Sequence, residues 1–246
     1  MRGTLVGLIP FTLLWSACSS VETESSTMFQ AVGKDVTGIH FINQLTDSDT
    51  FNIIDYLYYY NGGGLAVGDI NNDGLEDLYF SANMANNKLY LNKGNMQFED
   101  VSAASGTESP GPWKTGVTMS DVNQDGLLDI YLCRVGEYKG VSGRNELYIN
   151  NGNNTFSEKA KEYGLDFSGF STQAAFFDYD LDGDLDMYLL NHSVHTSRSY
   201  GRVDLRNDSD ELAGDRLYRN DSGRYIDVTR ESGIYNSQVG YGLGLA

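Results

Sequence analysis

Three nine-residue segments of the chain place acidic and amide side chains at alternating positions around a glycine. They follow the pattern Asp-x-Asn/Asp-x-Asp-Gly-x-x-Asp and begin at Asp69, Asp121 and Asp178. Carboxylates this close together repel each other, so folding them into one tight turn is costly unless a cation neutralises them. Glycine at the sixth position permits the left-handed backbone that lets such a loop wrap an ion. The pattern therefore predicts a cation site in each of these segments, which we call the first, second and third acidic loops.

The donor set of each acidic loop indicates which cation it would hold. Side-chain oxygens at positions 1, 3, 5 and 9 and the backbone carbonyl at position 7 form a cage that suits Ca²⁺. Because the donors include no Cys or His, structural zinc is excluded. The alternative is an Asx-rich turn without metal, which three copies at matching places disfavour. The predicted ligands are Asp69, Asn71, Asp73, the Leu75 carbonyl and Asp77; Asp121, Asn123, Asp125, the Leu127 carbonyl and Asp129; and Asp178, Asp180, Asp182, the Asp184 carbonyl and Asp186.

The first nine positions also fit an EF-hand loop, but the rest of the sequence does not. An EF-hand requires Glu at position 12, where this chain has Phe80, Leu132 and Leu189. The flanking residues have the composition of strands rather than helices. Each acidic loop is therefore expected to join two antiparallel strands.

The acidic loops belong to an internal repeat, because their leading Asp residues are 52 and 57 positions apart. Each loop is followed by a Leu-Tyr-x-Asn run and then by a short aromatic segment, so each unit offers four strand-length runs separated by turn residues. No amphipathic helix of useful length is evident. Repeated four-stranded units of about 50 residues are typical of β-propeller blades. The predicted fold class is all-β, a propeller of four-stranded antiparallel blades.

These motifs resemble those of a known family. The acidic loop between two strands, followed by Leu-Tyr-x-Asn and a short aromatic strand, is similar to the FG-GAP/VCBS repeat of integrin-α-type propellers over about residues 62–246. The segments 59–64 and 176–188 further resemble large bacterial VCBS-repeat proteins similar to cartilage acidic protein, which usually carry an ASPIC/UnbV domain beyond the repeats. The resemblance implies a seven-bladed propeller, extracellular calcium and no reaction. About three blades of seven would be present, so the chain is expected to be an N-terminal fragment.

The predicted organisation has three parts. Residues 1–18 have a positive residue, an apolar run and small residues before Cys18, which resembles a lipoprotein-type signal peptide with Cys18 as the lipidation site. An ordinary secretory signal is the alternative. A polar tether is predicted at 19–36 and the partial propeller at 37–246, with blades at about 62–107, 113–165 and 170–234 and the start of a further blade at 240–246.

Length variation between the repeats indicates where a ligand would bind. From the leading Asp to the Leu of Leu-Tyr-x-Asn, the distances are 20, 26 and 39 residues, which places insertions at the end opposite the acidic loops. Insertions confined to one face often mark a binding face. The alternative is that this insertion is a solvated loop and that nearby tyrosines pack between blades. The predicted ligand-binding residues are Trp113, His192, His195, Arg198 and Tyr200.

Charge and motif content narrow the function. The chain has 17 Lys+Arg against 34 Asp+Glu and a net charge of −17, which argues against binding nucleic acid. It contains no Gly-x-Ser-x-Gly, P-loop or plausible Cys–His pair. The leading hypothesis is a calcium-stabilised, non-catalytic binding or adhesion module for a protein or glycan, lipid-anchored at a bacterial outer membrane or cell surface. The alternative is an envelope-anchored glycan-active lyase or hydrolase with its site on the face opposite the acidic loops.

Overall fold

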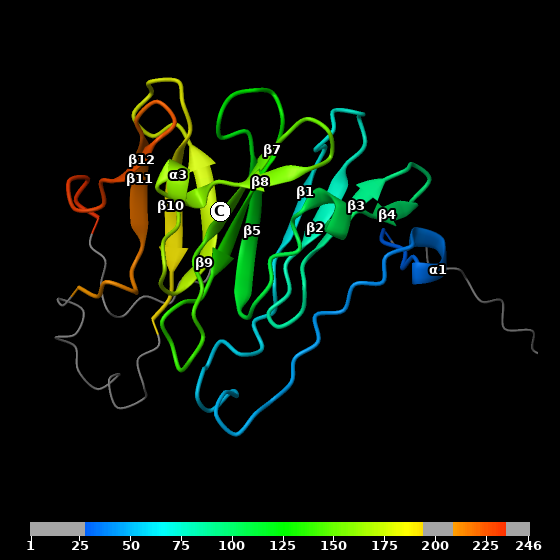
Figure 1. Ribbon diagram of the computed structural model, residues 1–246, viewed down its shortest axis with the longest axis horizontal. Coiled ribbons are helices and arrows are strands. Elements are labelled where there is room, and N and C mark those ends of the chain that lie inside the picture. Colours follow the sequence, from blue (N-terminus) through cyan, green and yellow to red (C-terminus); the bar gives the residue numbers. More distant parts are fainter. Residues whose placement is uncertain (1–27, 194–208, 235–246) are drawn as a thin grey trace, which may run out of the picture. The chain divides into compact units, whose positions relative to one another are not determined.

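The fold consists of three β-sheets that stand side by side (Figure 1). The computed structural model describes residues 28–193 and 209–234. The chain separates into two compact units, residues 1–32 and 33–246, and the described strands and helices lie in the second. Each sheet has four antiparallel strands in sequence order, as in one blade of a propeller. The predicted all-β fold class is confirmed.

The four strands of each sheet follow the four runs of each repeat. The first sheet contains β1 (Leu65–Gly68), β2 (Asp77–Phe80), β3 (Lys88–Asn92) and β4 (Phe98–Asp100). The second contains β5 (Lys114–Ser120), β6 (Asp129–Arg134), β7 (Glu146–Asn150) and β8 (Phe156–Glu158). The third contains β9 (Ser171–Phe177), β10 (Asp186–Asn191), β11 (Arg216–Asn220) and β12 (Tyr225–Asp227).

The strands pair in the same register in every sheet. The tyrosine of the second strand lies opposite the leucine of the Leu-Tyr-x-Asn run: Tyr79 pairs with Leu89, Tyr131 with Leu147 and Tyr188 with Leu217. A one-residue slip would turn every side chain to the other face of its sheet, so matching register keeps matching residues in the core. The repeat in the sequence is thus a repeat in three dimensions.

Apolar side chains between neighbouring sheets form the core. One buried cluster joins the first and second sheets, with Tyr79 and Leu89 packed near Ile130 and Leu132. A second cluster joins the second and third sheets in the same way. Burying each such side chain contributes about 1.5–3 kcal/mol. A hydrogen bond also joins the first strands of the second and third sheets. The Thr115 hydroxyl in β5 donates to the carbonyl of Ser171 in β9 at 2.8 Å.

In the described residues, short helices lie before the first sheet and after each of the first two sheets, and each ends in a left-handed glycine. They are α1 (Lys34–Thr37), α2 (Ser102–Ser105) and α3 (Ala160–Tyr163), capped by Gly38, Gly106 and Gly164 with φ near 73–79°. A Cβ on Gly38 would lie 2.7 Å from the carbonyl oxygen of Phe98, and one on Gly164 would lie 2.7 Å from that of Tyr225. Glycine is therefore required both by the backbone angle and by the contact with the next sheet.

Helix α1 differs from the sequence expectation, because it begins within the segment 19–36 that was predicted to be a polar tether. Its Gly38 meets β4 of the first sheet as Gly106 meets β8 of the second. This helix was not predicted from the sequence. A four-residue helix with a Gly cap is too short to give a periodic signal.

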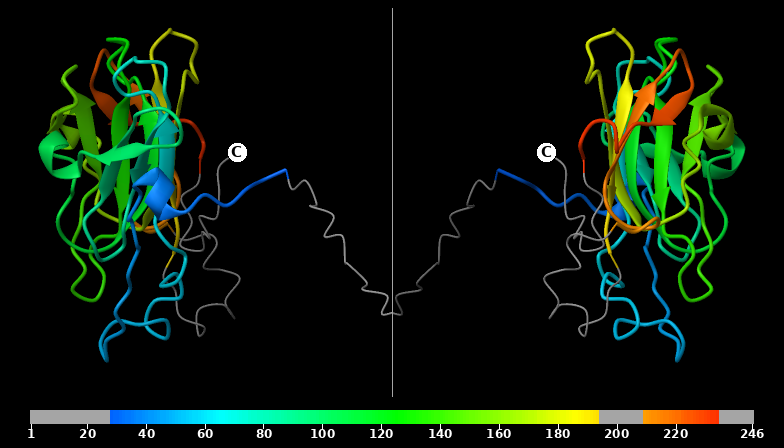
Figure 2. Two further views of the ribbon diagram at one scale, coloured as in Figure 1. Left: turned by 90° about the vertical axis from the view of Figure 1, so that its right-hand side faces the viewer. Right: turned by 90° about the vertical axis from the view of Figure 1, so that its left-hand side faces the viewer.

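The three acidic loops lie together at one end of the sheets, the upper end in Figure 1, because each joins the first and second strands of its sheet. The segment 45–60 projects from the opposite end, as the two side views in Figure 2 show. The longest connection between a second and a third strand, in the third repeat, lies mostly outside the described residues, so its separation from the acidic loops stays a prediction. Within the described residues, no helix has the length and apolar character needed to cross a membrane.

Candidate metal centres

Each acidic loop is closed by the carboxylate at its first position. The Asp69 carboxylate accepts the backbone N–H groups of Asp73 at 3.1 Å and Gly74 at 2.7 Å. Asp121 and Asp178 accept the corresponding N–H groups of their own loops. The glycines at position 6 have φ of 87°, 86° and 99°, as predicted. The backbone of each loop thus curls around its first carboxylate.

The carboxylate at position 9 is buried and is the first residue of the second strand. Both oxygens of Asp129 accept backbone N–H groups, one from Val122 at 3.0 Å and one from Asn150 at 2.8 Å. Asp77 and Asp186 make the same two bonds in their own sheets. Position 9 therefore ties the acidic loop to the third strand.

The Asn of each Leu-Tyr-x-Asn run has a role that the sequence analysis did not assign. The Asn150 amide donates to the carbonyl of Leu128, at position 8 of the second loop, at 3.1 Å. Asn92 and Asn220 donate to the equivalent carbonyls of Glu76 and Leu185. The recurrence of this Asn three positions after the Leu of each run was the available signal. It clamps the last turn of the loop onto the third strand.

Uncompensated negative charge gathers in the third loop. Carboxylate oxygens of Asp178, Asp180 and Asp186 all lie within 4.8 Å of one another. Desolvation and the neighbouring carboxylates raise the pKa of Asp180 and of Asp184. One buried oxygen of Asp184 has no hydrogen-bond partner. Since a divalent cation would relieve the repulsion within this cluster, the residues present fit such an ion.

The first and second loops share this geometry with one fewer carboxylate among the predicted side-chain ligands, because Asn71 and Asn123 replace Asp180. Each amide oxygen accepts the N–H at position 5 of its own loop at 3.1 Å. Burial raises the pKa of the Asp77 carboxyl, and it raises the pKa of the Asp129 carboxyl to about 6. In both loops the first carboxylate and the amide at position 3 thus accept the same N–H, that of position 5. Ca²⁺ as the occupant remains a prediction.

Two predicted ligand-binding residues lie inside the protein rather than on its surface. Trp113 is 1% exposed and His192 is fully buried. Both belong to a cluster in which Trp113 contacts Phe51, Tyr56 and Tyr59 and His192 contacts Phe170. This placement differs from the exposed position that the sequence analysis expected. His195, Arg198 and Tyr200, and the proposed lipidation site Cys18, lie outside the described residues.

The imidazole of His192 is held as a neutral group. Its Nε2 is 2.8 Å from the Tyr56 hydroxyl. The centroid of the imidazole ring is 4.1 Å from the centroid of the Tyr58 ring. Its Nδ1 is buried without a hydrogen-bond partner. Burial lowers the pKa of His192 to about 4. This side chain is thus part of the packing beneath the segment 45–60.

Acid should therefore destabilise the fold through His192. Unfolded, the imidazole gains its proton near pH 6.5, whereas the folded protein resists protonation until about pH 4, so stability present at neutral pH is lost across this window. We expect a loss of about 2–3 kcal/mol, measured by chemical denaturation in chelator between pH 7 and pH 4. His192→Gln should flatten this part of the pH profile. Parallel profiles for the two proteins would contradict the assignment.

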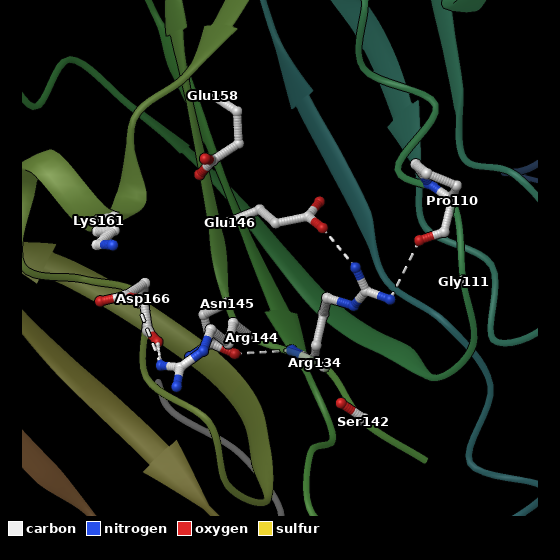
Figure 3. A pocket seen from close by; sticks show the side chains of 11 residues that line it. Pro110, Gly111, Arg134, Ser142, Arg144, Asn145, Glu146, Glu158, Lys161 and Asp166 are labelled. Atoms are coloured by element: carbon white, nitrogen blue, oxygen red, sulfur yellow. Dashed lines mark hydrogen bonds and ion pairs between the residues drawn. The ribbon is translucent and has the colours of Figure 1, made fainter. Parts of the chain in front are cut away.

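A solvent-open pocket of ≈ 580 Å³ lies at the end of the second sheet away from its acidic loop (Figure 3). Arg134 donates to Glu146 and, at 3.2 Å, to the carbonyl of Pro110. Arg144 donates to the carbonyl of Asp166 at 2.9 Å. The lining cations and carboxylates balance in number, so the pocket gives no preference for ligand charge, and we assign it no ligand.

Comparison with known proteins identifies the repeat. The model of the FG-GAP-like repeat matches residues 69–132, which include the first two acidic loops, and residues 135–189, which include the third. Two consecutive segments of this chain, which together hold all three acidic loops, thus match the FG-GAP-like repeat. The resemblance inferred from the acidic loops and the Leu-Tyr-x-Asn runs is thereby confirmed.

Relatives of the FG-GAP-like repeats fall into two groups. Mouse (Mus musculus) cartilage acidic protein 1 is 29% identical over 148 residues, which cover 59% of this chain and 22% of the relative. Human (Homo sapiens) cartilage acidic protein 1 is 31% identical over 91 residues, or 37% of this chain and 13% of the relative. Mouse integrin alpha-8 is 29% identical over 143 residues, or 52% of this chain and 13% of the relative. The chain thus spans about a fifth or less of these relatives.

Proposed function

We propose that the three acidic loops bind Ca²⁺ and that the ions stabilise a non-catalytic propeller module. The observation that carries this proposal is that Asp69, Asp121 and Asp178 each accept the same backbone N–H groups of their own loops. Further carboxylates of each loop follow within the same nine residues. The recurrence of one strained, acidic turn in all three repeats is explained if each turn binds a cation that prefers oxygen ligands. An ion would supply the charge neutralisation there, while the loop residues supply the cage.

Calcium titration tests this proposal directly. Isothermal titration of chelator-treated protein should show three calcium ions per chain, and Mg²⁺ should compete weakly because it demands a tighter octahedral cage. Asp125→Ala should remove one of the three, because Asp125 supplies a donor to the second loop alone. A stoichiometry unchanged by this substitution, or no calcium uptake at all, would contradict the assignment of the loops.

We further propose that the module binds a protein or glycan through the end opposite the acidic loops. The segment 45–60 exposes large apolar side chains there: Ile54 is 89% exposed, Leu57 58% and Tyr60 59%. Exposed aromatic and aliphatic groups beside a rigid scaffold suit sugar faces or partner side chains. The similarity to integrin alpha-8 and cartilage acidic protein 1 supports a binding role rather than catalysis.

Substitution of these side chains should separate binding from folding. Ile54→Asp and Leu57→Asp should abolish capture of any ligand found on a panel of glycans and envelope proteins, because each places a charge on the proposed apolar contact surface. Neither should affect folding, because both side chains are already solvated and contribute little to the core. Their melting curves should match the parent protein. Retained binding by both variants would place the ligand elsewhere, and turnover of a glycan would favour the enzyme alternative.

The extracytoplasmic setting is proposed on the N-terminal sequence. If Cys18 is the lipidation site of a bacterial envelope protein, cells fed a labelled fatty acid should label the chain, and Cys18→Ala should remove the label. A calcium-dependent module also suits an environment with abundant free calcium. Equal labelling of the variant would exclude Cys18 as the anchor.

A further inference from the structure

The acidic loops are linked to one another by side chains that are not among the predicted ligands. The Asn72 amide, at position 4 of the first loop, donates to the carbonyl of Gly126 in the second loop at 3.0 Å. The Gln124 amide, at position 4 of the second loop, donates to the carbonyl of Gly183 in the third loop at 2.7 Å. In both cases the acceptor is the glycine at position 6. The links therefore repeat from one blade to the next.

Each bridging amide belongs to a residue that lies between two predicted ligands of its own loop. Asn72 lies between Asn71 and Asp73, and its own φ is 56°, in the left-handed region. Gln124 has the same conformation, with φ of 59°, although a glutamine enters this region at some cost. Any ion that orders the donors at positions 3 and 5 must also fix the residue between them. The direction of the bridging amide therefore depends on the state of its own loop.

The acceptor is equally close to the neighbouring site. The carbonyl of Gly126 and the N–H of Leu127 belong to one peptide group. That N–H donates to the Asp125 carboxylate at 2.9 Å, and the Gly126 N–H donates to Asp121 at 2.9 Å. The next carbonyl, that of Leu127, is a predicted ligand. Asn72 thus holds a peptide group that bonds one predicted donor of the second loop, Asp125, and that lies between the peptide groups of the Gly126 N–H and the Leu127 carbonyl.

The third loop has no equivalent donor. Its position 4 is Leu181, which has φ of 64° and is 86% exposed. The aliphatic side chain cannot donate a hydrogen bond, so among the described residues the links run from the first loop to the second and from the second to the third. Leu181 also shows which side chain the same backbone accepts without a bridge, and so supplies the substitution for a test.

We propose that Asn72 and Gln124 are positioning residues that couple the three acidic loops, so that an ion bound in one loop favours binding in the adjacent loop. This inference rests on the proposed calcium binding. A loop with an ion holds its position 4 in place, and the bridging amide then pre-orders the ligand-bearing peptide of its neighbour, which loses less conformational freedom on binding. The coupling is reciprocal, because each ion must affect the other by the same factor.

The expected size follows from the bond that carries the coupling. A neutral, solvent-exposed hydrogen bond is at the low end of the usual range, so each link should change calcium affinity in the adjacent loop about two- to fivefold. The signature is a titration steeper than that of three independent sites. It should become shallower when either amide is replaced.

The experiment isolates the first link by disabling the first loop. Asp73→Ala removes a donor from that loop and leaves Asn72 in place. Calcium-dependent hydrogen exchange of the peptide spanning residues 121–129 then reports the affinity of the second loop. Asp73→Ala should weaken that affinity about two- to fivefold in the parent protein and leave it unchanged in Asn72→Leu, where the bridge is already absent. Asn72→Gln, which keeps the donor, should retain the response.

Other outcomes overturn the inference. If Asp73→Ala has the same effect on residues 121–129 with and without the Asn72 amide, coupling does not pass through this bond. If Asn72→Leu lowers the melting temperature equally in calcium and in chelator without changing calcium affinity, the bridge only stabilises the contact between two blades and does not couple their loops. Absence of any calcium uptake by the parent protein would overturn the proposed function as well, and titration calorimetry distinguishes that failure from the others.

Discussion

Chelation of calcium is expected to lower the melting temperature by about 5–10 °C for each acidic loop that loses an ion. An ion at about 100 times its dissociation constant stabilises the folded state by about 2.7 kcal/mol, because the unfolded chain lacks the cage. For a chain of this size, 1 kcal/mol corresponds to about 2–4 °C. Without the ion, the carboxylates of Asp178, Asp180 and Asp186 remain within 4.8 Å of one another and repel. Calorimetry or circular dichroism in EGTA and in excess calcium measures the difference.

Salt separates specific binding from general screening. The net charge of −17 alone would make the folded chain more stable in concentrated NaCl, since added ions screen repulsion. If the loops are calcium sites, NaCl should recover a small part of the lost stability and Mg²⁺ should recover less than calcium. Equal rescue by NaCl and calcium, or identical melting curves with and without chelator, would show that the acidic loops are metal-independent turns.

The parts of the fold that the sequence predicted are those set by local spacing. The acidic loops recur with Asp, Gly and Asp at fixed positions, and short alternating strands flank them, so the hairpins followed from period and turn chemistry. The Leu-Tyr-x-Asn runs marked the third strands for the same reason. Repetition strengthened each of these inferences, because a pattern seen three times is constrained by one common structure.

The parts that the sequence did not predict depend on contacts between distant residues. His192 is buried because it meets Tyr56, 136 positions earlier in the chain, and no local pattern encodes that contact. In a long connection without periodicity, the sequence does not distinguish an aromatic or cationic residue that is exposed from one that is buried. The Asn72–Gly126 link, 54 positions apart, is hidden for another reason. Position 4 of the loop is variable in type, and its partner is a backbone carbonyl.

The two carboxylates at positions 5 and 9 of the second loop should respond differently to alanine substitution. Asp129→Ala removes the acceptor for two buried N–H groups, those of Val122 and Asn150. Each unpaired buried donor costs about 1–3 kcal/mol. Removal of the buried charge offsets part of this, because burial already raises the pKa of Asp129 to about 6. In chelator we expect a net loss of about 2–4 kcal/mol in the free energy of unfolding, and in excess calcium a larger loss, because Asp129 is also a predicted ligand of the ion.

Asp125→Ala is the matched control, because Asp125 is exposed and belongs to the same loop. Its carboxylate accepts one backbone N–H, that of Leu127, which water can satisfy after substitution. In chelator, Asp125→Ala should therefore change stability by no more than about 0.5 kcal/mol. In excess calcium it should cost about 2.7 kcal/mol, the contribution of one lost ion.

Denaturant unfolding of the parent protein and both variants, in calcium and in chelator, measures all these values. A loss at position 9 that persists in chelator, beside a loss at position 5 that requires calcium, would assign a structural role to position 9 and a role in ion binding alone to position 5. A loss at Asp129 that vanishes in chelator would refute this division. In that case the hydrogen bonds from Val122 and Asn150 would form only around a bound ion, and position 9 would be a ligand first and a structural residue second.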